Sequence, residues 1–306
     1  MTSNLAPVVL FVYNRPLHTS KTIESLQKNF LAKDTELFIY SDGPRLEKDV
    51  HLVQKIRQYI KNIHGFKNIT IIERENNWGL SQNIIQGVND VLSSHGKIIV
   101  LEDDLITSPY FLKYMNNALN HFQDKKRIMS ISGYNHPPSI MKFPANYNKQ
   151  VYFNYRNSSW GWGTWKDRWE IVDWNIEDFN DFKKNKRLQK KFNRCGNDVT
   201  NMLISQMQGK IDSWAIRFTY AHFKQDALSV CPVHSYVNNI GHDGSGQHCG
   251  NTNRYINDLL EVSENIEFPK HIEVDERVMD EFRSIYKRGI LERLMKIIER
   301  ITCKIA

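Results

Sequence analysis

The stretch GKIIVLEDDLITSP, residues 96–109, decides the fold of this chain. Its segment 98–101 is apolar without interruption, which is typical of a strand buried on both faces of a sheet. Three carboxylates follow at once: Glu102, Asp103 and Asp104. We therefore expect this acidic triplet at the carboxyl end of a central strand, where open α/β sheets bind ligands. Adjacent carboxylates repel each other, so the triplet is either a solvated turn or a site for Mg²⁺ or Mn²⁺ shared with substrate phosphates.

The segments around this strand alternate between strand and helix patterns. We expect strands at 7–13, 36–40 and 69–72, with helices between them, followed by the strand at 98–101. This alternation predicts an α/β fold with a mostly parallel sheet flanked by helices. Later strands are expected at 128–131, 151–154 and 228–231, helices at 198–207 and 212–224, and an aromatic, glycine-broken loop at 158–169.

Composition excludes several classes of protein. The 306 residues are 41% hydrophobic and 25% charged, as in a globular domain. The formal net charge is +7, but residues 282–306 hold seven Lys or Arg against two Glu, so the excess lies in the tail and argues against a nucleic-acid groove. The four cysteines lack paired metal spacing, no 18-residue apolar run occurs, and we expect no signal peptide. We expect a cytoplasmic protein with reduced thiols.

The tail has a helical pattern of its own. Apolar residues recur at three- and four-residue steps between Ile290 and Ile305, flanked by Lys and Arg. A basic amphipathic helix of this kind suits an anionic membrane surface, so we expect the protein to be peripheral on the inner membrane face. The alternatives are a helix packed on the rest of the chain or a dimer contact.

Four short motifs occur in a characteristic order: Asn14-Arg15-Pro16, Ser41-Asp42-Gly43, Asn77-Trp78-Gly79-Leu80 and Leu101-Glu102-Asp103-Asp104. Together they resemble the GT-A fold of nucleotide-sugar glycosyltransferases, over residues 6 to 250. Glu-Asp-Asp in place of a looser Asp-x-Asp is most similar to the N-acetylglucosaminyltransferase I type and to related bacterial sugar transferases. The resemblance implies one GT-A domain, 1–270, with a nucleotide-sugar half (1–132) and an acceptor half (133–270). Residues 271–306 would form the helical basic tail.

The resemblance also implies which residues bind the donor. Asp42 would hydrogen-bond the uracil imide of a UDP-sugar, and the turn of Tyr13, Asn14 and Arg15 would line the base pocket. From the residues alone, Asp42 is equally an Asp-Gly turn, and Asn14 and Arg15 are helix-capping positions.

In the acidic triplet, the implied roles differ from residue to residue. Asp103 would face the ribose or sugar, Glu102 would orient its neighbours or touch the sugar, and Asp104 would bind Mn²⁺ or Mg²⁺ between the two phosphates. A late histidine often completes such a site. Both His242 and His248 are candidates for a neutral imidazole ligand, and the resemblance to the family pattern favours His248.

The acceptor side carries the expected catalytic base. An inverting transfer needs a carboxylate to take the proton of the acceptor hydroxyl, and similar enzymes place it before a Trp at the start of a late helix. Asp212 fits this context, although Ser213 stands where a second acid is common, and Asp212 could instead be an N-cap. Asp243 and Asp173 are the reserve candidates.

A cluster of tryptophans suggests how the acceptor would be held. Aromatic faces stack on sugar rings, so Trp160 and Trp162 are expected acceptor contacts, and Arg168 could hold a phosphate or hydroxyl. The predicted function is an inverting, metal-dependent hexosyl- or N-acetylhexosaminyltransferase. It would use a UDP-sugar and a glycan or lipid-linked acceptor, in bacterial surface polysaccharide synthesis. The alternatives are a nucleotidyltransferase that makes NDP-sugars and a non-catalytic carbohydrate-binding protein. The sequence does not identify the sugar, the acceptor, the linkage or the oligomeric state.

Overall fold

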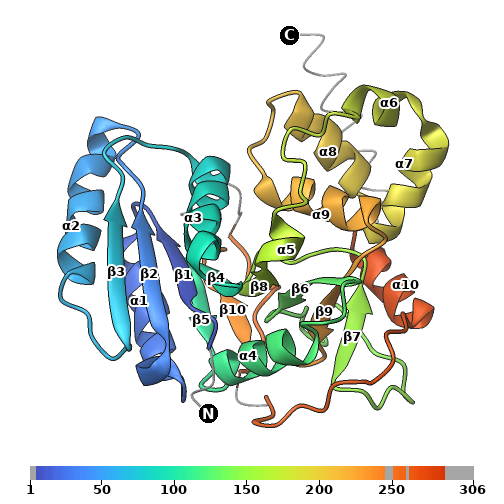
Figure 1. The fold of residues 1–306 in the computed structure, drawn as a ribbon, viewed down its shortest axis with the longest axis horizontal. Coiled ribbons are helices and arrows are strands. Elements are labelled where there is room, and N and C mark those ends of the chain that lie inside the picture. The colour runs from blue at the N-terminus through green and yellow to red at the C-terminus, as the bar shows by residue number, and fades with distance from the viewer. Residues whose placement is uncertain (1–4, 245–250, 260–261, 287–306) are drawn as a thin grey trace.

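The computed structural model describes residues 5–244, 251–259 and 262–286. Its centre is an eight-stranded sheet in the order β3-β2-β1-β4-β8-β6-β9-β7 (Figure 1). The strands are β1 Val8–Val12, β2 Glu36–Ser41, β3 Asn68–Glu73, β4 Lys97–Glu102, β6 Ile128–Ser132, β7 Val151–Asn154, β8 Trp162–Trp165 and β9 Leu228–Pro232. β3, β2, β1 and β4 are parallel, as are β6 and β9, whereas β8 and β7 run antiparallel to their neighbours. The predicted α/β fold with a mostly parallel sheet is confirmed.

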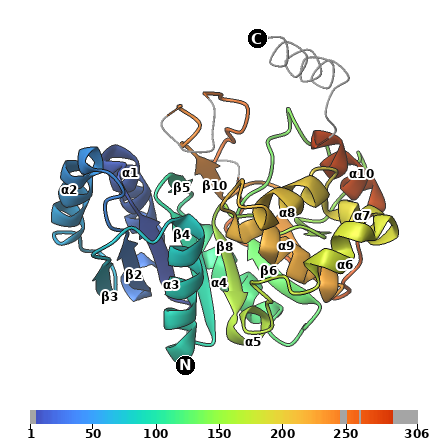
Figure 2. The same ribbon diagram turned by 90° about the horizontal axis from the view of Figure 1, so that it is seen from above.

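Helices cover both faces of the sheet. They are α1 Pro16–Gln27, α2 Val50–Ile60, α3 Leu80–Ser94, α4 Phe111–His121, α5 Lys166–Trp169, α6 Phe179–Lys184, α7 Lys186–Phe192, α8 Val199–Met207, α9 Trp214–Lys224 and α10 Glu276–Ile285. In β1, Val8 and Leu10 pack with the apolar faces of α1, α2 and α4, whereas Val9 and Phe11 pack with α3 and α9. Figure 2 shows α1 and α2 on the opposite side of β1 and β2 from α3. Because successive side chains of a strand point to opposite faces, a continuous apolar run is what a two-sided core requires.

The strand at 98–101 lies where the sequence predicted it. It is the core of β4, between β1 and β8, and Ile98, Ile99, Val100 and Leu101 are all fully buried. Glu102 is the last residue of the strand. The acidic triplet therefore sits at the carboxyl end of a central strand, as expected.

The prediction of an aromatic, glycine-broken loop at 158–169 is wrong from residue 162 onward, because a strand and then the short helix α5 occupy these positions. Trp162–Trp165 forms β8, an antiparallel strand inserted between β4 and β6. Glycine has a low intrinsic preference for strands, which is why the sequence pattern indicated a loop. Here, however, a Cβ on Gly163 would lie 2.8 Å from the carbonyl oxygen of Ile98. Gly163 is therefore required by the close approach of β4, a reason that only the paired strand supplies.

A second, two-stranded sheet lies next to the acidic triplet. β5 Leu105–Thr107 pairs antiparallel with β10 Val237–Asn239, which is about 130 residues further along the chain. This pairing brings the segment that follows β10 back to the end of β4. The segment includes the expected His242.

The first part of the predicted tail packs on the domain. In α10, Val278, Met279 and Phe282 join a cluster with Tyr152 and Cys231. The amphipathic pattern of 290–305 lies outside the described residues, so its membrane role stays a prediction. Within the described ranges, no helix is long and apolar enough to cross a bilayer.

Candidate active site

The carboxyl ends of β1 and β4 form a topological switch point. β1 lies between β2 and β4, so the chain adds β2 and β3 on one side of β1 and β4 on the other. Phe11 pairs with Glu102 in parallel register. The segments 13–15 and 102–104 therefore leave the sheet side by side, in the position where doubly wound sheets bind ligands.

Arg15 binds the two aspartates of the triplet. Its Nη2 lies 2.5 Å from Asp103 Oδ1 and 2.9 Å from Asp104 Oδ2, and all three side chains are largely buried. Burial lowers the pKa of Arg15, but the charges of Asp103 and Asp104 outweigh it and raise that pKa overall. The resemblance implied that Arg15 lines the base pocket, whereas the structure places its guanidinium on the acidic triplet.

One arginine does not balance three carboxyl groups. Burial, followed by the charges of Asp104 and Asp103, raises the pKa of Glu102 to about 8. Burial also raises the pKa of Asp103, although Arg15 opposes the shift. This arrangement favours either a bound proton or a further cation beside Arg15.

The loop after β10 closes against Asp104. The backbone N–H of Ile240 donates to the carbonyl oxygen of Asp104 at 2.8 Å. A Cβ on Gly241 would lie 2.2 Å from Asp104 Oδ2 and 2.9 Å from Arg15 Nη1. Because no side chain fits there, Gly241 is required by the approach of the loop to the carboxylate.

His242 brings a nitrogen donor to the same place. Asp104 interacts with its ring electrostatically, burial lowers the pKa of His242, and its buried Nε2 has no hydrogen-bond partner among the described residues. A neutral imidazole nitrogen and a carboxylate are a donor set that fits Mn²⁺ or Mg²⁺. Within the described ranges, no three His, Cys, Asp or Glu side chains are arranged so that they could hold a metal ion by themselves, so the remaining ligands would come from substrate phosphates or water. His248 lies outside the described residues.

The carboxylate of Asp42 organises a turn, and few of its hydrogen-bonding sites remain free for a ligand. Its carboxylate, 5% exposed, accepts hydrogen bonds from the backbone N–H groups of Gly43, Trp78 and Gly79 and from Asn77 Nδ2, at 2.9 to 3.1 Å. A carboxylate has about four lone-pair sites, and these four donors fill them. The structure thus brings together two motifs of the sequence, but a contact of Asp42 with a uracil imide would require one of these bonds to break.

Tyr13 and Asn14 share a partner that the sequence analysis did not identify. The Tyr13 hydroxyl and Asn14 Nδ2 each donate to Asp49 at 3.0 Å, and the Tyr13 hydroxyl accepts from the backbone N–H of Arg45. Asp49 ends the 3₁₀ turn Glu47–Asp49 and is buried. Its only sequence signal is its place shortly after Asp42 in a polar loop. Arg15 stands at the N-cap of α1 without a side-chain cap hydrogen bond, so the capping alternative does not describe it.

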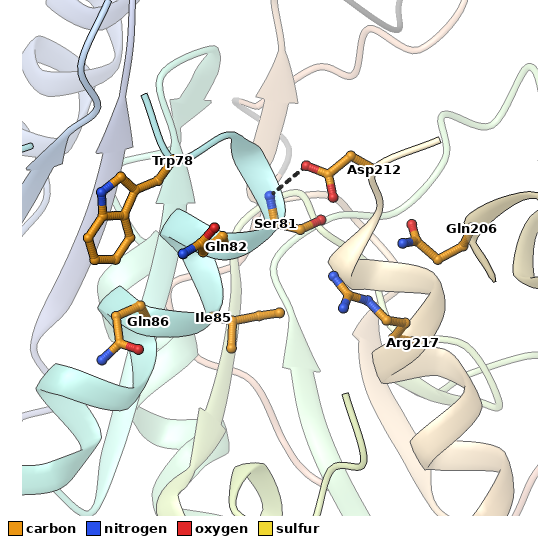
Figure 3. A pocket seen from close by; sticks show the side chains of 8 residues that line it. All are labelled: Trp78, Ser81, Gln82, Ile85, Gln86, Gln206, Asp212 and Arg217. Atoms are coloured by element: carbon orange, nitrogen blue, oxygen red, sulfur yellow. Dashed lines mark hydrogen bonds between the residues drawn. The ribbon is translucent and has the colours of Figure 1, made fainter. Parts of the chain in front are cut away.

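Asp212, just before α9, contacts the N-terminal end of α3. Its Oδ2 accepts a hydrogen bond from the backbone N–H of Ser81 at 3.2 Å, at the start of α3 (Figure 3). Asp42 accepts from Gly79 two residues earlier. Asp212 also lines a cavity of about 360 Å³ between α3 and α9, together with the Gln82, Gln86 and Gln206 amides. The acidic triplet is not among the described residues that line it.

The alternatives to Asp212 have other contacts. Ser213, not Asp212, is the N-cap of α9, because its side chain accepts from the backbone N–H of Ile216. Asp243 lies 3.0 Å from His18 Nε2. Asp173 accepts three backbone N–H bonds from residues 175–177 and so organises a turn.

The structure separates Trp160 from the other expected acceptor contacts. Trp162 is 1% exposed and stacks on Trp214 at 4.6 Å, and it therefore offers no face to a ligand. Arg168 is 3% exposed, pairs with Asp167 and donates to two backbone carbonyls after α4. Both belong to the core in this structure, whereas Trp160 lines a second cavity.

Several solved structures are similar to this chain over part of its length. Among solved structures, the mannosyltransferase PcManGT from Pyrobaculum calidifontis, in complex with GDP-Man and Mn²⁺, matches 43% of this chain and 36% of its own. It is 13% identical, with a TM-score of 0.31. S. aureus TarS 1-349 matches 76% of this chain and 59% of its own, at 12% identity and a TM-score of 0.39. TarS 1-349 in complex with UDP matches 45% and 40%, at 17% identity and a TM-score of 0.31. The chain thus spans less than two thirds of the length of each.

No curated protein sequence matches the chain. The family model for glycosyl transferase family 2 matches residues 8–206, which include β1, the acidic triplet and most of α8. The match covers more than half of the chain. It favours a glycosyltransferase over the two alternatives, a nucleotidyltransferase and a non-catalytic carbohydrate-binding protein. The protein belongs to glycosyl transferase family 2.

Proposed function

We propose that this enzyme is an inverting, metal-dependent glycosyltransferase. It transfers a sugar from a UDP-sugar to a glycan or lipid-linked acceptor in bacterial surface polysaccharide synthesis. The observation that carries the proposal is the buried cluster of Glu102, Asp103 and Asp104 with Arg15 at the switch point, in a chain of this family. The charge excess of the cluster matches a site that takes up a divalent cation together with a diphosphate.

Asp104 and His242 would hold the metal, with His248 as the further candidate. The bound ion would neutralise the negative charge of the departing nucleoside diphosphate. Arg15 already contacts both aspartates, and its buried Nη1 lacks a hydrogen-bond partner within the described ranges. We expect Arg15 to orient these carboxylates and to donate from Nη1 to a donor oxygen. The segment of Tyr13 and Asn14 and the turn held by Asp42 would enclose the nucleoside.

Asp212 would act as the general base. It takes the proton of the acceptor hydroxyl, the freed oxygen forms a bond to the anomeric carbon, and the bond to the phosphate oxygen breaks. UDP leaves with the bonding electron pair. Attack from the face opposite the phosphate inverts the anomeric configuration. The contact of Asp212 with Ser81, next to the turn held by Asp42, supports a position beside the donor site.

The first experiment measures UDP release from a panel of UDP-sugars with Mn²⁺ and with excess chelator. We expect release that the chelator abolishes and that Asp104→Asn reduces strongly, with an unchanged unfolding temperature. Full activity in chelator or in Asp104→Asn contradicts the metal assignment.

The second experiment uses Asp212→Asn. The amide oxygen of asparagine still accepts from the Ser81 N–H, so the variant keeps the cap of α3 but loses the base. Turnover should fall about 10²-fold or more with donor affinity almost unchanged. If donor affinity or folding collapses instead, Asp212 has a structural role.

A further inference from the structure

A second cavity, of about 270 Å³, lies beside the candidate active site. Its walls are the loops after β6 and β7, the start of α9 and the end of α10, and its apolar lining includes the rings of Tyr134, Trp160 and Tyr286. Trp160 packs edge-on against Tyr134 at 4.4 Å and against His242 at 5.4 Å. His242 is the candidate metal ligand, so this cavity adjoins the donor site.

Arg156 places a cation in the cavity wall. Its guanidinium lies over the Tyr286 ring at 4.4 Å, and its Nη1 donates to Asp198 at 2.8 Å. Its Nη2 contacts the sulfur of Met202 at 3.6 Å, which is a weak acceptor. Since five N–H donors of a guanidinium seek oxygen acceptors, Arg156 retains donor capacity for a ligand.

Asn157 lines the same cavity with an unused donor. It is 7% exposed, and its Oδ1 accepts from the Thr219 hydroxyl at 2.5 Å. Its buried Nδ2 has no hydrogen-bond partner in the part of the chain that the structure describes. A buried amide donor without a partner is unfavourable, and a hydrogen bond to a ligand oxygen would remove that cost.

The first turns of α9 flank the cavity. Ser213, Ala215, Ile216 and Thr219 line it, so the helix presents one side to this space. The neighbouring charges are mainly cationic: burial, followed by the charges of Arg156 and Arg254, lowers the pKa of His136 to about 4. Asp198 is the acidic partner of Arg156. An unused amide donor and a guanidinium thus converge on one space.

We propose that this cavity is an acceptor subsite that binds the anionic group, a phosphate or a carboxylate, of a saccharide whose ring packs on Trp160. Arg156 and Asn157 Nδ2 donate to the anionic oxygens. The inference rests on the proposed function, because it names the class of acceptor: an acidic or phosphorylated sugar rather than a neutral one.

The test measures binding of three small probes by calorimetric titration, without donor: glucose 1-phosphate, glucuronic acid and glucose. We expect at least one anionic probe to bind tenfold or more tightly than glucose. A preference for glucose 1-phosphate identifies a phosphate group, and a preference for glucuronic acid identifies a carboxylate. Equal binding of all three probes, or no binding, overturns the proposal.

Two variants locate the site. Arg156→Gln and Asn157→Asp should each weaken the anionic probe at least tenfold; the latter keeps the oxygen that meets Thr219 but places negative charge in the wall. Arg194→Gln is the matched control, because Arg194 stacks on Tyr155 and pairs with Asp226 and is not among the residues that line the cavity. Thermal unfolding checks each fold. Unchanged binding in Asn157→Asp refutes the site even if Arg156→Gln fails to fold.

These titrations need no turnover. A failure of UDP release would therefore count against the proposed function while probe binding remained readable. Conversely, an active enzyme that binds acidic and neutral probes alike would keep the proposed function and lose this inference.

Discussion

Replacing Gly241 by alanine tests how closely the loop after β10 must approach the acidic triplet. The new Cβ would lie 2.2 Å from Asp104 Oδ2 and 2.9 Å from Arg15 Nη1, whereas real Cβ contacts essentially never fall below 3.0 Å. Either the carboxylate or the loop must therefore shift by at least about 0.8 Å. The hydrogen bond from Ile240 to the Asp104 carbonyl oxygen resists a shift of the loop, so we expect the carboxylate to move.

A shift of this size should damage activity more than stability. A misplacement of about 1 Å at a reacting centre costs on the order of 10²-fold in rate, whereas overpacking costs roughly 1–3 kcal/mol of unfolding free energy. The assay compares kcat/KM for UDP release, the Mn²⁺ concentration at half-maximal rate and the unfolding temperature.

The control is Gly96→Ala, because a Cβ at Gly96 meets nothing within 4 Å. It should leave the rate and the Mn²⁺ requirement unchanged. Wild-type kinetics and an unchanged Mn²⁺ requirement in Gly241→Ala would refute the assignment of Asp104 and its neighbouring loop to the active site.

Two further outcomes are expected from the structure and one from the sequence of the tail. Asp42→Ala leaves four donors of a buried turn unpaired, so it should cost about 3 kcal/mol by urea unfolding as well as donor affinity, and a loss of affinity alone would contradict the organising role. Burial lowers the pKa of His222 from 6.5 to about 4, so native stability is fully present above pH 6.5 and should fall by up to about 3 kcal/mol toward pH 4. This decline should be shallower in His222→Gln, and equal pH profiles would exclude His222 as its source. In flotation with anionic vesicles, only the full chain should bind in a salt-sensitive way; equal binding by a chain ending at Gly289 would favour a packed or dimeric tail.

The sequence alone indicated a mostly parallel sheet without β8, the position of the acidic triplet, and a resemblance to GT-A glycosyltransferases. Each of these features depends on local sequence patterns. An unbroken apolar run indicates a strand buried on both faces, and short motifs after successive strands indicate the edge of the sheet where parallel strands end. Asp104 and Arg15 are therefore predicted as site residues from the sequence alone, and the structure shows that they contact each other. The tail pattern at 290–305 is equally local, but its partner is not encoded in its spacing.

Only the tertiary structure decided which side chains meet. The sequence did not reveal that Arg15 binds the aspartates or that Asp49 accepts hydrogen bonds from Tyr13 and Asn14. It also did not reveal that the Asp42 carboxylate accepts hydrogen bonds from the turn before α3. Each of these contacts joins segments that are far apart in the chain. Trp160 and Trp162 are two positions apart in one aromatic motif, yet one lines a cavity and the other lies in the core. β8 begins at Trp162, and its pairing with β4 and β6 places this residue on the face of the sheet where Trp169, Trp214 and Phe218 pack against its indole and bury it.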